Sequence, residues 1–157
     1  MTSLRHKQAV IAIPLVNLYR ENGQVNVMDS TVVKLRVLLA DDHMLVRECL
    51  RILLGAYDDV EIVGEAADGE EAVALAVQYR PDIVVMDLNM PKLNGAEATV
   101  RIKHQLPDVI VVGLSIQQGA PMEQLMKQAG ASAFVTKELA ETQLYPAMKK
   151  AMKLKTF

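Results

Sequence analysis

The segment DIVVMDLNMP at residues 82–91 contains an uninterrupted apolar run at 83–86 and then presents a carboxylate at Asp87. Four consecutive apolar residues, three of them β-branched, favour a strand buried on both faces, as strands in the middle of a parallel sheet are. A second run of this kind occupies residues 109–112. We therefore predict a parallel sheet whose central strands span residues 82–87 and 109–114.

Working outward from this segment, β-branched runs alternate with stretches of helical period, a pattern typical of an α/β fold with helices covering a parallel sheet. Helices are expected between the strands, including one at 95–105 and one at 122–129. The five expected strands are 35–40, 60–65, 82–87, 109–114 and 133–136.

Two of the expected helices carry clear local signals. The first has an apolar stripe at helical spacing that includes Leu45, Cys49 and Leu50, so we expect Cys49 on its buried side. The second has Asp68 as its N-cap and Glu71 three residues later, the spacing of a capping box.

Length and composition limit the domain organisation. At 157 residues, 51% of them hydrophobic, the chain has room for one domain with a full core. We expect that domain at 35–153, with a tail at 154–157. Residues 1–34 lack comparable order, and Asn22-Gly23 and Asp29-Ser30 indicate turns. They are interpreted as a leader or linker, an extra element, the end of a larger protein, or the product of an upstream start codon, because Met28 also suits a start.

Charge and hydropathy exclude several partners. The net charge of −2 provides no positive field for nucleic acid, so direct nucleic-acid binding is not expected. The longest early apolar run, 9–18, is interrupted by Pro14 and is too short to cross a bilayer, so no membrane partner is expected. The single cysteine cannot form an internal disulfide, which favours a cytoplasmic location.

Acidic residues fall at the ends of two predicted strands. Asp41 and Asp42 follow the first strand directly, and Asp87 ends the third. If the second and third strands flank the first, in the order 2-1-3-4-5, these carboxylates converge in the crevice at the carboxyl ends of the strands. Three such charges repel one another, and Mg²⁺ is the cation that suits an oxygen-rich site and recruits phosphate oxygens. Asn89 adds a main-chain carbonyl.

Two more polar residues are predicted at the same edge of the sheet. Ser115 follows the fourth strand and Lys137 follows the fifth. A carboxylate nucleophile, a cation site, a hydroxyl and an ammonium are the groups that phosphoryl transfer requires.

Taken in order along the chain, these fragments resemble the signature of response-regulator receiver domains. The resemblance extends from residue 35 to about residue 153 and implies a flavodoxin-like, doubly wound (βα)5 fold. The fragments that carry it are Asp41-Asp42, Met86-Asp87-Leu88-Asn89-Met90-Pro91, Asn94-Gly95, Ser115 and Phe134-Val135-Thr136-Lys137.

The resemblance also implies roles for these residues. Asp87 would accept a phosphoryl group from a histidine kinase or phosphotransfer protein, while Asp41 and Asp42 hold Mg²⁺. Ser115 and Lys137 would bind the phosphoryl group. Ser115 and Phe134 would relay the change to the surface of the fourth helix, fifth strand and fifth helix, which a downstream protein or attached output domain reads. The resemblance is also compatible with a homodimer that forms on phosphorylation.

The chain is therefore expected to be a signalling switch, with no enzymatic activity beyond self-phosphorylation from small donors and autodephosphorylation. Ile116 replaces the small residue usual in the family after Ser115, and we expect it to modulate access to Asp87. Two alternatives are a haloacid-dehalogenase-like aspartyl phosphatase and a degenerate receiver that serves only for docking. The phosphatase would need a second aspartate where Asn89 stands.

Overall fold

The computed structural model describes residues 18–21, 24–27, 33–117 and 119–155. The chain divides into two units, Met1–Val32 and Val33–Phe157, and each is described by itself. None of the described helices combines the length and apolar character that a membrane-spanning segment needs.

The described part of the first unit is a β-hairpin. Strands β1 (Leu18–Glu21) and β2 (Gln24–Val27) pair antiparallel. No strand is predicted here from the sequence, although the interpretation of residues 1–34 includes an extra element. The strands are only four residues each, too short for alternation of apolar and polar residues to be recognised. The turns predicted at 22–23 and 29–30, and the apolar run as far as residue 17, lie outside the described residues.

The second unit contains a five-stranded parallel sheet. Its strand order is β4-β3-β5-β6-β7, which confirms the predicted order 2-1-3-4-5 when the strands of this sheet are counted along the chain. The strands are β3 (Leu35–Ala40), β4 (Val60–Ala66), β5 (Ile83–Asp87), β6 (Ile110–Ser115) and β7 (Ala133–Thr136).

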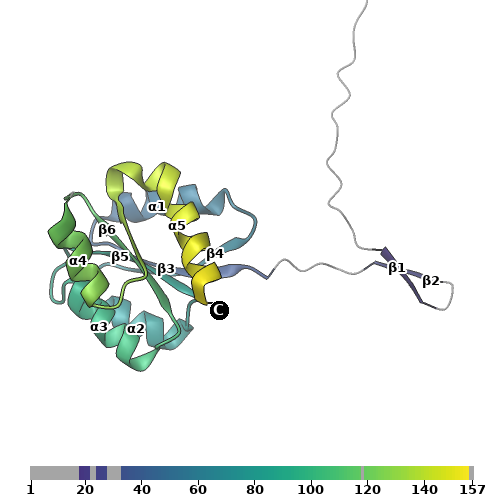
Figure 1. Cartoon of the computed structure of the whole chain (residues 1–157), viewed down its shortest axis with the longest axis horizontal. Coiled ribbons are helices and arrows are strands. Elements are labelled where there is room, and N and C mark those ends of the chain that lie inside the picture. Colours follow the sequence, from purple (N-terminus) through teal and green to yellow (C-terminus); the bar gives the residue numbers. More distant parts are fainter. Residues whose placement is uncertain (1–17, 22–23, 28–32, 118, 156–157) are drawn as a thin grey trace, which may run out of the picture. The chain divides into compact units, whose positions relative to one another are not determined.

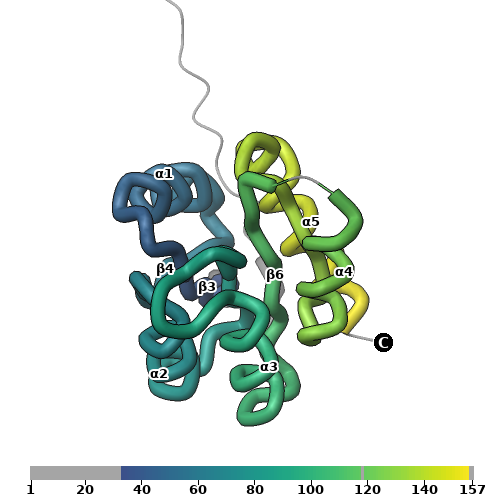
Figure 2. Tube along the Cα trace, turned by 90° about the vertical axis from the view of Figure 1, so that its left-hand side faces the viewer, coloured from purple at the N-terminus to yellow at the C-terminus, as the bar shows by residue number. Residues whose placement is uncertain are grey.

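Helices cover both faces of this sheet (Figures 1 and 2). Helices α1 and α5 pack on one face, and α2, α3 and α4 pack on the other. A 3-10 turn, η1, links β7 to α5. The bounds are α1 (Met44–Gly55), α2 (Gly69–Tyr79), α3 (Gly95–Gln105), α4 (Ala120–Gln128), η1 (Lys137–Leu139) and α5 (Ala140–Lys155).

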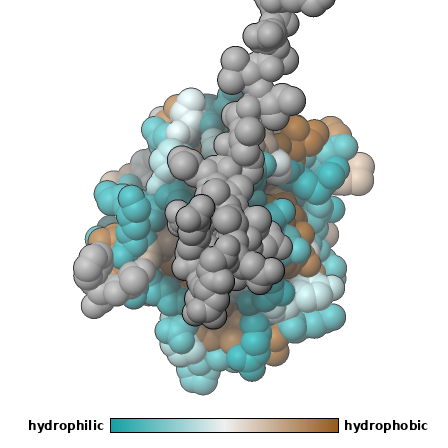
Figure 3. Space-filling view, turned by 90° about the vertical axis from the view of Figure 1, so that its right-hand side faces the viewer, coloured by the Kyte–Doolittle hydropathy of each residue, from teal (hydrophilic) through white to brown (hydrophobic). Residues whose placement is uncertain are grey.

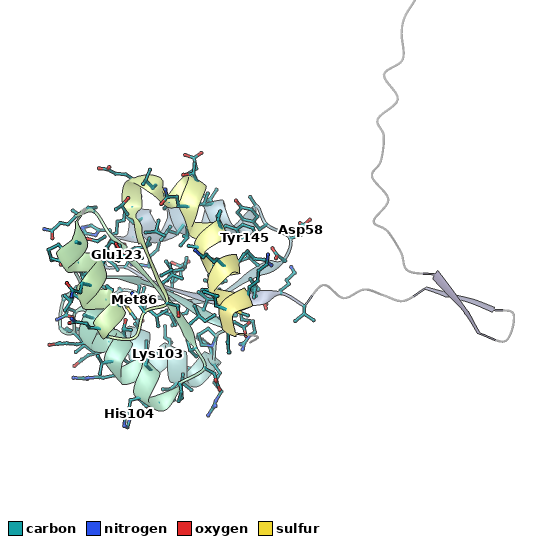
Figure 4. The ribbon with its side chains drawn as sticks, viewed as in Figure 1. Asp58, Met86, Lys103, His104, Glu123 and Tyr145 are labelled. Carbon is teal, nitrogen blue, oxygen red and sulfur yellow. The ribbon has the colours of Figure 1, made fainter. Side chains whose placement is uncertain are left out.

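The central strand β5 is buried along its whole length, as its apolar run predicts. Successive side chains of a strand point to opposite faces. Val84 and Met86 therefore join the core under α2, α3 and α4, while Ile83 and Val85 join the core under α1 and α5. Figure 4 shows Met86 inside the molecule, between the two helical layers. Two cores thus hold the end of β5 in place.

One prediction about α1 is wrong. Leu50 and Leu54 are buried against the sheet, but Cys49 is exposed and Leu45 is 69% exposed. Each residue of an α-helix is rotated by about 100° from the one before, so Cys49 faces away from the direction of Leu50. The apolar stripe of α1 is wider than the part of the helix surface that packs against the sheet. Exposed apolar patches among hydrophilic side chains are also visible on the face drawn in Figure 3.

Candidate phosphoacceptor site

Polar residues from four strands meet at the carboxyl edge of the sheet. Asp41 and Asp42 follow β3, Asp87 is the last residue of β5, Ser115 ends β6 and Lys137 follows β7. Because the strands are parallel, these positions lie along one edge. We call this group the strand-end site.

Lys137 joins the two buried carboxylates of the strand-end site. Its Nζ lies 2.5 Å from Oδ2 of Asp41 and 3.2 Å from Oδ2 of Asp87. Asp41 is fully buried and Asp87 is 2% exposed. The Lys137 ammonium neutralises part of the carboxylate charge but lies outside hydrogen-bond geometry toward Asp41 Oδ2, and this buried oxygen has no hydrogen-bond donor among the described residues.

The surroundings of Asp87 disfavour its ionised form. Burial, and next the negative charge of Asp41, raise the pKa of the Asp87 carboxyl above its ordinary value. Lys137 opposes this rise through its charge and its hydrogen bond. A cation added beside Asp41 and Asp87 would lower the cost of keeping both carboxylates charged.

His43 belongs to the same cluster, although its spacing to other histidines predicts no metal ligand. Its Nδ1 lies 3.0 Å from Oδ1 of Asp42 and 3.3 Å from Oδ1 of Asp41. One potential ligand atom each from Asp41, Asp42, His43 and Asp87 lies within 4.8 Å of all the others. The one sequence signal for His43 is its position directly after Asp41-Asp42.

Asn89 lies beside the strand-end site. Its backbone N–H donates a 3.5 Å hydrogen bond to Oδ1 of Asp87, while its side chain is exposed. The loop after β5 then returns to α3, where the backbone N–H of Gly95 donates to the carbonyl of Leu88.

The two predicted switch residues occupy neighbouring strands. Ser115 is fully buried, and its Oγ accepts a 3.0 Å hydrogen bond from the backbone N–H of Gln117. Phe134 pairs with Gly113 across the β6–β7 ladder and packs at the edge of the core under α2, α3 and α4. Gly113 and Ser115 are two residues apart and so share a face of the sheet, which puts Ser115 and Phe134 on the same side.

Ile116 does not lie in the buried part of the site. It is 66% exposed and lines a groove together with Leu45 and Cys49 of α1 and Ala140 of α5. Lys137 also lines this groove, so the groove leads from α1 to the strand-end site.

An ion pair that the sequence does not predict links two loops next to Asp87. The Nζ of Lys92 donates a 2.8 Å hydrogen bond to Oδ2 of Asp68. Asp68 also caps α2 by accepting the backbone N–H of Glu71 at 2.8 Å, which confirms that cap. The carboxylate of Glu71 accepts the N–H of Ala67 in return, one residue before the cap.

The fold and the arrangement of the strand-end site define a flavodoxin-like receiver. The sequence model of the response regulator receiver domain matches residues 37–149. The chain therefore belongs to the response regulator receiver domain family, the receiving module of two-component systems.

Relatives agree with this assignment. The transcriptional regulatory protein DegU of Brevibacillus brevis is 39% identical over 74% of this chain and 49% of its own length. The response regulator GacA of Pseudomonas viridiflava is 36% identical over 73% of this chain and 54% of its own. This chain thus spans about half the length of the curated relatives it matches. Both relatives are named as regulators.

Solved structures share the fold. The response regulator domain of Thermotoga maritima CheB superposes with a TM-score of 0.72 at 31% identity, over 76% of this chain and 97% of that one. A LuxR-family two-component response regulator from Aurantimonas superposes with a TM-score of 0.73 at 36% identity, over 76% of this chain and 86% of that one.

Proposed function

We propose that this domain is a phosphorylation-controlled switch, in which Asp87 accepts a phosphoryl group from the phosphohistidine of a histidine kinase or phosphotransfer protein. The observation that carries the proposal is the contact of one ammonium, that of Lys137, with the carboxylates of both Asp41 and Asp87. This contact supports a site in which the nucleophile, the cation ligands and the phosphate-binding group would lie together.

The charges of the cluster fit a divalent cation. The carboxylates of Asp41, Asp42 and Asp87, set against one ammonium, leave a net charge of about −2 when all are ionised. The convergence of potential ligand atoms from Asp41, Asp42 and Asp87 within 4.8 Å of one another supports this fit. Asp41, Asp42, Asp87 and the main-chain carbonyl of Asn89 would hold Mg²⁺, which when bound supplies positive charge to the phosphate oxygens.

In the proposed reaction a carboxylate oxygen of Asp87 attacks phosphorus while the P–N bond of the phosphohistidine breaks. The electron pair of that bond leaves with the imidazole, and an acyl phosphate forms on Asp87. Lys137 and the hydroxyl of Ser115 would neutralise and hydrogen-bond the phosphoryl oxygens, which is the main catalytic contribution a protein makes to phosphoryl transfer.

The switch would follow from a competition for Ser115. Its Oγ now accepts the N–H of Gln117, and a phosphoryl group on Asp87 would draw it toward the strand-end site. Phe134, on the same side of the sheet, would move with it and change the surface formed by α4, β7 and α5. Phosphorylation then acts by stabilising one of two conformations.

Ile116 is proposed to modulate access to Asp87 and to slow autodephosphorylation. Its exposed side chain in the groove between α1 and α5 supports a position on the approach path of water or a phosphodonor. We expect the aspartyl phosphate of Ile116→Ala to hydrolyse faster than that of the wild type. Equal hydrolysis rates in both proteins would refute this role.

We further propose the receiver domain at 35–153, a leader, linker or extra element at 1–34 and a tail at 154–157. The partners would be a kinase or phosphotransfer protein and a downstream protein or attached output domain, with a homodimer formed on phosphorylation. The net charge of −2 provides no positive field for nucleic acid, so we propose that this domain does not bind nucleic acid directly.

The proposal is tested by labelling with radioactive acetyl phosphate in the presence of Mg²⁺. Asp87→Asn should lose labelling, because the amide is not a nucleophile at this position. Asp58→Asn is the matched control, since Asp58 is exposed in the loop before β4 (Figure 4). Undiminished labelling of Asp87→Asn would reject the assignment of the phosphoacceptor.

A further inference from the structure

We propose that His43 is itself a ligand of the cation site, and that it gives this site a preference for divalent cations that bind imidazole nitrogen over Mg²⁺. The inference rests on the proposed function, because it requires that Asp41 and Asp42 hold a cation. It goes beyond that function by adding a nitrogen donor to an otherwise oxygen-based ligand set.

The distances fit neighbouring ligands of one octahedral ion. Ligand atoms about 2.1 Å from such an ion lie about 3 Å apart at adjacent corners. The Nδ1 of His43 lies 3.0 Å from Oδ1 of Asp42 and 3.3 Å from Oδ1 of Asp41. Its Nδ1 therefore stands at the correct separation from two proposed ligands at once.

The backbone holds His43 in this position. Its N–H donates a 2.9 Å hydrogen bond to Oδ1 of Asp41, which fixes the residue over the site. His43 is also the N-cap residue of α1, but its side chain makes no capping hydrogen bond. The imidazole is 68% exposed, so an ion from solvent can reach its Nδ1 directly.

A purely hydrogen-bonding role for the same ring makes a different prediction. If Nδ1–H only donates to the carboxylate of Asp41 and pairs with that of Asp42, removing the ring disturbs carboxylates that every divalent cation uses, and all cations lose affinity alike. If Nδ1 binds the ion, the loss falls on nitrogen-preferring cations. Ni²⁺ and Mg²⁺ separate the two cases, because imidazole suits Ni²⁺ whereas Mg²⁺ favours oxygen ligands.

The experiment is calorimetric titration of the full chain with Ni²⁺ alone and with Mg²⁺ alone, near pH 7.5 where free imidazole is mostly neutral. His43→Ala should bind Ni²⁺ about tenfold more weakly, with Mg²⁺ affinity changed by less than about twofold. His43→Asn, which retains a good N-cap residue, should behave in the same way. The Ni²⁺ absorption spectrum should also shift in both variants.

Two further variants serve as controls. His104→Ala removes an exposed imidazole that projects from the far end of α3, and it should leave both affinities unchanged (Figure 4). Asp42→Asn should weaken binding of both cations, because it removes an oxygen ligand from the site itself.

Equal losses of Ni²⁺ and Mg²⁺ affinity in His43→Ala, or no loss of either, would overturn the role of His43. Failure of the wild-type chain to bind Mg²⁺, or Mg²⁺ binding unaffected by Asp42→Asn, would instead overturn the proposed cation site on which the inference rests. The two failures are distinguished by the Mg²⁺ titrations of the wild type and Asp42→Asn.

Discussion

At the scale of single residues, Gly95 determines whether the backbone at Asp87 can adopt its position. Gly95 is the first residue of α3, and Asn94 caps the helix by accepting the N–H of Glu97 at 2.9 Å. A Cβ on Gly95 would lie 2.0 Å from the carbonyl oxygen of Asp87. The absence of a side chain here lets α3 begin directly against the end of β5.

Gly95→Ala should therefore lower the free energy of unfolding by about 3 kcal/mol, because backbone atoms must move to relieve the overlap. Gly55→Ala is the matched control, since a Cβ on Gly55 meets no atom within 4 Å. In that helical position alanine should be neutral or stabilise by up to about 1 kcal/mol. Urea denaturation measures both, and equal stabilities of the two variants would contradict the argument.

At the scale of elements, the loop between β5 and α3 is held against the start of α2. Lys92 adopts a left-handed conformation with φ of 64°, which is uncommon for a residue with a side chain. Its ammonium reaches Asp68, and a Cβ on Gly69 would overlap the carbonyl oxygen of Leu93. The N-terminus of α2 and the loop that carries Asn89 are thus closely packed, which fixes the loop beside Asp87.

The Asp68–Lys92 pair makes stability depend on pH in a defined direction. The hydrogen bond from Lys92, and next that from the Glu71 N–H, lower the pKa of Asp68 below its ordinary value of 3.8. A folded pKa below the unfolded one means that the stabilisation is present above the unfolded value. It is lost as the pH falls through the folded value.

Asp68→Asn should consequently be less stable than the wild type at neutral pH, and the difference should shrink as the pH drops below about 4. Asparagine caps helices as well as aspartate does, so this variant removes the charge and retains the cap. Asp68→Ala also removes the cap and should cost about 1 kcal/mol more. Urea denaturation across this pH range measures the differences, and a gap that widens on acidification would contradict the ion-pair account.

At the scale of the whole molecule, the parallel sheet and its order could be predicted because β5 and β6 are apolar up to their last residues, Asp87 and Ser115, and are interior strands of the sheet. The sequence signals at the ends of α3 are equally local, and its predicted bounds agree with the structure. The acids at the strand ends could be identified because topology alone brings them to one edge. These signals need no knowledge of side-chain contacts.

Other features depend on contacts that sequence spacing does not contain. The exposure of Cys49 follows from how α1 is rotated on the sheet, and the pairing of Lys92 with Asp68 joins residues 24 apart in the chain. The position of His43 against Asp42 depends on the backbone conformation between β3 and α1. These features can be recognised only in the three-dimensional structure.

The strand-end site combines residues from 41 to 137, so its proposed function requires the complete fold of the second unit. The most direct measurement is to identify the phosphorylated residue after treating the full chain with acetyl phosphate. Borohydride reduces an aspartyl phosphate to homoserine, which mass spectrometry locates in the sequence. We predict homoserine at position 87 with Mg²⁺ present and little with a chelator. Modification at another acid, or equal modification without Mg²⁺, would contradict the account.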